Sequence, residues 1–99
     1  MNIENLTQTV KERFDYESAK QVLKEKYEAK MLFALSGGMW CANPELITLL
    51  TAFSTDDIVI CDTYGNPCQV NRTELLHSAK ERYQEQMNAW VNEYDEVSR

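Results

Sequence analysis

The last third of the chain is a long stretch without glycine or proline in which apolar residues recur at helical spacing. Between positions 72 and 97, the residues that recur every seven positions are Leu76, Tyr83, Trp90 and Val97. This periodicity predicts one amphipathic helix over residues 72–97, which is about 39 Å long at 1.5 Å per residue. A chain of 99 residues has little core to cover such a rod, so we expect part of the helix to lie against a partner.

The length and composition indicate one folded domain over residues 1–99. Apolar residues make up 43% of the chain and aromatic residues 10%, which is typical of globular rather than disordered proteins. No apolar run approaches the ~20 residues that span a bilayer. The N-terminal sequence lacks the basic start and apolar stretch of a secretory signal. We therefore expect a cytoplasmic protein, or one packaged inside a particle, with no membrane partner.

The net charge of −6 is unevenly distributed along the chain. Residues 1–40 carry six acids and six bases, whereas residues 41–99 carry ten acids and four bases. Nonspecific nucleic-acid binding depends on lysine and arginine neutralising phosphates, so this balance argues against a nucleic-acid partner. It fits a solvated acidic face or a basic protein partner, and mimicry of a nucleic acid stays open as an alternative.

A second long helix is predicted before the centre of the chain. We expect residues 1–13 to form a polar lead-in, with a helix as one of its open conformations. Asp15 can cap a helix over residues 15–35. Ser36-Gly37-Gly38 is the expected stop, since glycine accepts the left-handed conformation at a helix end. The apolar positions of this helix are Tyr16, Ala19, Val22, Leu23, Tyr27, Met31, Ala34 and Leu35. We expect it to pack antiparallel to the helix over residues 72–97.

The middle of the chain predicts a short helix followed by a β-hairpin. Asn43 and Pro44 are typical of a helix start, which predicts a helix over residues 44–53. Residues 58–61 and 68–70 are extended and flank a turn, so they form a hairpin over residues 58–70. A two-stranded hairpin is marginal in water, and residues 39–42 are the candidate third strand.

The last helix has a strong start signal of its own. Asn71 can cap it, and Glu74 stands at the position that completes a reciprocal cap. The predicted fold is therefore α+β and mostly helical, with two long antiparallel helices, one short helix and a small β-hairpin.

Three cysteines and the single histidine are candidate metal ligands or catalytic groups. Cys41, Cys61, Cys68 and His77 are of the types that bind zinc, but no Cys-x-x-Cys motif is present. Cys61 and Cys68 face each other across the hairpin only if its loop holds four residues. A thiol–histidine pair would also need an orienting group and an oxyanion site that the sequence does not show. We expect no catalytic residues, metal or cofactor, and interpret the cysteines as small apolar residues.

Two other motifs invite a functional interpretation and have simpler explanations. Ser36-Gly37-Gly38 lacks the further glycines and the lysine of a phosphate-binding loop. The spacing of Asp56, Asp57 and Asp62 does not match a calcium loop, and the first two are more typical of a turn before a strand.

The aromatic residues of the last helix are the better indication of function. Tyr83, Trp90 and Tyr94 share one side of the helix. They can pack on the first long helix as core, or they can bind a second copy or another protein. The first half, Leu75 to Tyr83, is expected to be core. The predicted interface residues are Trp90, Tyr94, Val97, Tyr83 and Met87, with Trp40 as a second exposed anchor.

Two segments of the C-terminal half carry a family resemblance. Residues 62–67 read Asp-Thr-Tyr-Gly-Asn-Pro and residues 70–76 read Val-Asn-Arg-Thr-Glu-Leu-Leu, which is a turn followed by a capped helix. The spacing that continues them is that of Tyr83, Met87, Asn88, Trp90 and Tyr94. In these features the C-terminal 40 residues resemble small conserved-hypothetical proteins of large contractile-tailed bacteriophages. The resemblance implies a compact phage accessory, assembly or virion protein, and it carries no catalytic signature.

We therefore predict a non-enzymatic protein-interaction or assembly protein that acts through the aromatic face of its last helix. It is expected to be a homo-oligomer or a subunit of a larger assembly. One alternative is an acidic regulator or inhibitor that binds a basic host protein through residues 41–99. The least favoured alternative is a small zinc or thiol enzyme.

Overall fold

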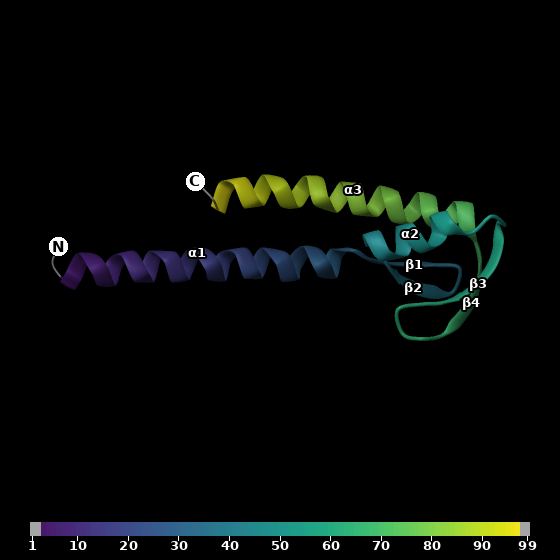
Figure 1. Ribbon diagram of the computed structural model, residues 1–99, viewed down its shortest axis with the longest axis horizontal. Coiled ribbons are helices and arrows are strands. Elements are labelled where there is room, and N and C mark those ends of the chain that lie inside the picture. The colour runs from purple at the N-terminus through teal and green to yellow at the C-terminus, as the bar shows by residue number, and fades with distance from the viewer. Residues whose placement is uncertain (1–2, 98–99) are drawn as a thin grey trace.

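The computed structural model describes the backbone of residues 3–97 and the side chains of residues 12–13 and 15–97. It is an elongated α+β protein of 66 × 23 × 20 Å (Figure 1). Its elements are α1 (Ile3–Lys30), β1 (Leu32–Leu35), β2 (Gly38–Cys41), α2 (Pro44–Ala52), β3 (Asp57–Cys61), β4 (Pro67–Asn71) and α3 (Arg72–Val97).

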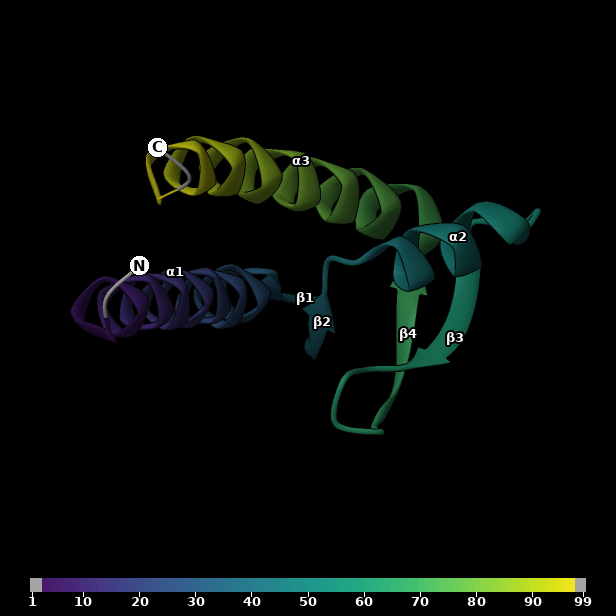
Figure 2. The same ribbon diagram turned by 60° about the vertical axis from the view of Figure 1, so that its left-hand side comes forward.

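The two long helices lie side by side and run in opposite directions, as Figures 1 and 2 both show. The helix predicted over residues 72–97 is confirmed with the same bounds. The strands and α2 gather at one end of the pair, around the start of α3. At the other end α1 extends well past the end of α3, so the molecule is a compact head with a long helical projection.

The predicted bounds of the first long helix are wrong at both ends. The helix begins at Ile3 rather than after Asp15, so residues 3–13 are part of it and Asp15 is not its cap. No glycine or proline interrupts residues 1–30, which leaves no local signal to start the helix later. It ends at Lys30, and residues 32–35 form a strand instead of its last turn.

The first hairpin explains why the helix stops early. Leu35 pairs with Gly38 across a two-residue turn, and Ser36 and Gly37 have positive φ angles of 51° and 79°. Positive φ at both turn residues matches the twist of a tight hairpin. Ser36-Gly37 therefore turns a strand rather than ending a helix.

The third strand predicted at residues 39–42 does not join the hairpin over residues 58–70. β2 pairs with β1, and β3 with β4, so the chain has two separate antiparallel hairpins. Hydrogen bonds link β2 to the loop after β3: the Thr63 amide donates to the Met39 carbonyl at 2.8 Å, and the Met39 amide donates to Asp62 Oδ2 at 3.1 Å.

The predicted helix caps at Asn43 and Asn71 are present. The Leu46 amide donates to Asn43 Oδ1 at 2.8 Å at the start of α2. The Glu74 amide donates to Asn71 Oδ1 at 2.9 Å at the start of α3. These bonds satisfy backbone amides that have no partner within the helix, so local sequence alone determines where both helices begin.

The core lies where the two hairpins, α2 and the first half of α3 meet. Trp40 is its largest fully buried side chain, and its indole nitrogen donates to the Leu35 carbonyl at 2.9 Å. Its other fully buried members are Ala42, Leu50, Leu75 and Ala79. The expectation that Trp40 is an exposed anchor is therefore wrong. A Cβ at Gly38 would lie 2.9 Å from the Trp40 ring, so the indole occupies the space that a side chain there would need.

Candidate interaction surface

Trp90 lies on α3 beyond the core and stacks on α1. Its indole is 5.8 Å from the Tyr27 ring between centroids, with the planes 8° from parallel. Tyr27 is only 2% exposed, whereas Trp90 is half-buried. One face of the indole therefore contributes to the packing of the two helices, and the rest of it stays accessible.

A charged cluster holds the same two helices together beside the stack. Lys26 Nζ donates to Glu93 Oε1 at 2.7 Å, and the Tyr27 hydroxyl donates to the same oxygen at 2.6 Å. The hydrogen bond from Lys26 is the largest cause that lowers the pKa of Glu93, followed by that from Tyr27. The bond to Glu93 raises the pKa of both Tyr27 and Lys26. Charge-assisted bonds are short and directional, so this cluster sets how α3 is rotated against α1.

An apolar hollow lies next to Trp90 on the second half of α3. It has a volume of about 210 Å³ and is lined by Met87, Trp90, Val91 and Tyr94. Val91 is 50% exposed and Tyr94 is 38% exposed. Exposed apolar side chains that cluster in one depression are candidates for contact with a partner.

A second hollow adjoins the first and leads to the head of the molecule. It has a volume of about 430 Å³, and Met87 and Trp90 line both hollows. Its other lining residues are Glu28, Met31, Cys41, Ala42, Asn43 and Tyr83. We call Tyr83, Met87, Trp90, Val91 and Tyr94 the Trp90 surface, since together they form a strip along α3 from the core towards its free end.

The structure brings together four of the six residues predicted for the interface, namely Tyr83, Met87, Trp90 and Tyr94. Val97 ends α3 outside both hollows, and Trp40 belongs to the core. Sequence reasoning did not predict Val91 as an interface residue, because Val91 is not one of the positions that recur every seven residues. Its spacing of four residues from Met87 was the available signal, because residues four apart are neighbours on a helix surface.

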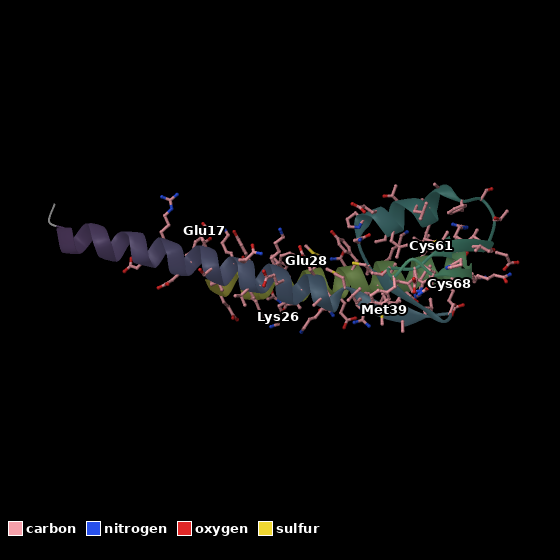
Figure 3. All side chains as sticks on the ribbon, turned by 90° about the horizontal axis from the view of Figure 1, so that it is seen from below. Glu17, Lys26, Glu28, Met39, Cys61 and Cys68 are labelled. Carbon is pink, nitrogen blue, oxygen red and sulfur yellow. The ribbon has the colours of Figure 1, made fainter. Side chains whose placement is uncertain are left out.

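The candidate metal ligands are scattered. Cys61 and Cys68 do not face each other, because Ile60 pairs with Cys68 and Cys61 pairs with Pro67. His77 is exposed on α3, where its Nε2 lies 3.4 Å from Glu81. Figure 3 shows Cys61 and Cys68 at the head of the molecule, away from Lys26 and Glu28 on α1. Within the described residues no group of three or more histidine, cysteine or acidic side chains converges as a metal site would require.

Asp56 and Asp62, two of the three aspartates considered for cation binding, accept hydrogen bonds within the fold. Asp62 accepts from the backbone amides of Met39, Tyr64 and Asn66 at 2.9–3.1 Å. The amide of Asn66 is the largest cause that lowers the pKa of Asp62, and that of Met39 is the next. Asp56 accepts from Thr73 Oγ1 at 2.8 Å and from Arg72 at 3.3 Å. The Asp62 carboxylate therefore stabilises the turn after β3, and the Asp56 carboxylate stabilises the start of α3.

No family model, curated protein or solved structure matches the chain. Among its described helices, none combines the length and the apolar character that crossing a membrane requires.

Proposed function

We propose that this chain is a non-enzymatic protein-interaction or assembly protein that binds its partner through the Trp90 surface. The observation that carries the proposal is the apolar hollow of Met87, Trp90, Val91 and Tyr94 at the outer end of α3. Large aromatic side chains in partly enclosed pockets are the usual anchors of protein interfaces. Covering Val91 and Tyr94 removes apolar area from water, which is the main favourable contribution to association.

The rigidity of the anchor supports the same proposal. Trp90 is stacked on the buried ring of Tyr27, and the neighbouring Glu93 cluster fixes the rotation of α3. A side chain that is already ordered loses little conformational entropy when a partner binds. The Trp90 indole therefore presents its free edge to a partner in one orientation.

The shape of the surface favours a helical segment as the partner. The strip follows α3 for roughly three turns, from Tyr83 to Tyr94, which suits a helix that lays apolar residues at intervals of three and four into a groove. The resemblance to small phage proteins supports assembly or virion accessory work as the setting in which this binding takes place.

An acidic regulator that captures a basic host protein is the second candidate. It is supported by the exposed acids Glu81, Glu85, Asp95 and Glu96 on α3. The two candidates differ in salt dependence, since binding between exposed charges weakens as ionic strength rises. Binding anchored by the apolar Trp90 surface is expected to weaken less with salt than capture of a basic protein by these acids.

Photo-crosslinking from the surface tests the main proposal. A photoreactive amino acid at position 91 is expected to give covalent adducts in cells, to a second copy or to another protein. The matched control is position 22, because Val22 is also an exposed helical valine (63% exposed) and lies outside both hollows. Adducts from position 91 and none from position 22 support the proposal. A position 91 that yields no protein adduct overturns it.

A further inference from the structure

The long projection of α1 points to an occupant for the Trp90 surface. We propose that the projecting half of α1 from a second copy lies along the Trp90 surface, so that two chains form a twofold antiparallel dimer. This inference rests on the proposed function and names its partner. Three observations support it: the register of α1 against α3, the charge distribution of α1, and the lengths of the projecting part of α1 and the uncovered part of α3.

The register of the two helices defines the projection. Tyr27 lies opposite Trp90, and Arg82 Nη1 donates to the Lys30 carbonyl at 3.4 Å. Because the helices are antiparallel, the seven residues from Trp90 to Val97 correspond to the seven from Tyr27 back to Lys20. Residues 3–19 of α1 therefore extend past the end of α3, over about 25 Å at 1.5 Å per residue (Figure 1).

A partner would stabilise this projecting part of α1. Most helical stability in proteins comes from tertiary packing of an apolar face, which residues 3–19 do not obtain from α3 of their own chain. The sequence of the projecting half has Ile3, Leu6, Val10 and Phe14 at intervals of three, four and four residues. This is the spacing with which one helix packs on another.

The charge of α1 selects a second copy over an unrelated helix. Residues 3–17 contain four acids and two bases, a net charge of −2, whereas residues 18–30 contain two acids and four lysines, a net charge of +2. When two α1 helices run antiparallel, the acidic half of each lies beside the lysine-bearing half of the other. Lys20 and Lys24 have long ion pairs of 3.6 and 4.0 Å on their own helix, which are weak when exposed.

The lengths also match. The Trp90 surface runs along α3 from Tyr83 to Tyr94, about 18 Å at 1.5 Å per residue, and the projecting half of α1 is long enough to cover it. Each copy carries one projecting helix and one uncovered hollow at the same end of the molecule. A twofold axis places both projections on both hollows, which is the self-complementary arrangement that closed dimers use.

Light scattering with matched variants tests the dimer. The chain is expected to elute with twice its mass of 11.5 kDa. Val10→Glu and Val91→Glu should each raise the dimer dissociation constant at least tenfold, while the control Val22→Glu leaves it unchanged. Circular dichroism checks that each variant stays helical. A strictly monomeric wild-type chain overturns the inference, as does a dimer that both variants leave intact.

Charge reversal tests the antiparallel arrangement. One chain carries Asp15→Lys with Glu17→Lys, and the other carries Lys20→Glu with Lys24→Glu. In a homodimer of either variant, the two halves of α1 that lie side by side carry the same charge, so each variant alone should be largely monomeric. In the mixture, each half faces a half of opposite charge, so a heterodimer should form. A mixture that stays monomeric overturns the antiparallel pairing.

The crosslink at position 91 separates failure of this inference from failure of the proposed function. Adducts between copies that map to residues 3–19 support the dimer. Adducts only to a different protein overturn the dimer and leave the Trp90 surface as a binding site. The absence of any adduct overturns both.

Discussion

The indole of Trp90 lies parallel to the ring of Tyr27, with the ring centroids 5.8 Å apart. These two residues come from opposite ends of the sequence, and their stack fixes the register of α1 against α3. The same indole also lines both hollows of the Trp90 surface. Helix packing and the proposed binding site therefore share one side chain, and changes to either ring are expected to affect both.

The stack should appear as an energetic coupling between positions 27 and 90. Aromatic pairs contribute about 0.5–1.5 kcal/mol beyond their burial, so a double-mutant cycle of Tyr27→Leu and Trp90→Leu, measured by urea unfolding, should give a coupling of about that size. Tyr27→Phe keeps the ring and should keep the coupling. Additive effects of the two leucine substitutions would contradict the stack.

Glu93 should make stability depend on acid pH. Its pKa in the folded protein lies below its ordinary value of 4.5, so its stabilising effect is present above pH 4.5 and is lost as pH falls through the lower folded pKa. Glu93→Gln removes the charge, so the variant should be less stable than wild type at neutral pH. The difference should shrink as the pH falls below 4.5.

Urea unfolding across this pH range measures the difference. Glu96→Gln, at an exposed acid of the same helix, is the control and should show little difference at any pH. A gap between wild type and Glu93→Gln that stays constant on acidification would rule out the ion pair as the source of the stabilisation.

Asp62 should protect the loop between β3 and β4. Its carboxylate accepts from the amides of Tyr64 and Asn66 at 3.0 and 2.9 Å. In Asp62→Ala these amides lose their acceptor, so their hydrogens should exchange faster with solvent. Amides in the middle of α3 should keep their exchange rates, because the change is local. Unchanged exchange at positions 64 and 66 would contradict this role.

Gly38 should tolerate no side chain. A Cβ there would lie 2.9 Å from Trp40 Cζ2 and 3.0 Å from Cys68 Sγ, so Gly38→Ala forces the core apart and should cost about 1–3 kcal/mol in unfolding free energy. Gly37→Asn is the control, since no atom lies within 4 Å of a Cβ there and asparagine accepts positive φ. Equal stability of Gly38→Ala and wild type would refute the packing argument.

Helix-capping residues in the sequence correctly predicted where two of the helices begin. The starts of α2 and α3 follow from the side chains of Asn43 and Asn71, which accept hydrogen bonds from nearby backbone amides. The strand over residues 32–35 does not follow in this way. Its apolar residues also fit the helical spacing before them, and pairing with residues 38–41 decides in favour of the strand.

The candidate site shows the same division between local and tertiary information. The spacing of Tyr83, Met87, Trp90 and Tyr94 was sufficient to place them on one side of a helix. The solvent exposure of these side chains depends on the position of Tyr27 on α1, which is determined by tertiary packing. Trp40 was predicted as an exposed anchor, but the missing side chain at Gly38 leaves space that its indole occupies in the core.

The contrast between the two tryptophans gives the protein a built-in optical reporter. Trp40 is enclosed in the core, at 1% exposure, and its emission will follow the unfolding of the head. Trp90 sits at the surface, so its emission will shift to shorter wavelength when a partner excludes water from it. A Trp40→Phe chain that stays folded would leave Trp90 as the single fluorophore, and binding could then be followed without any added dye.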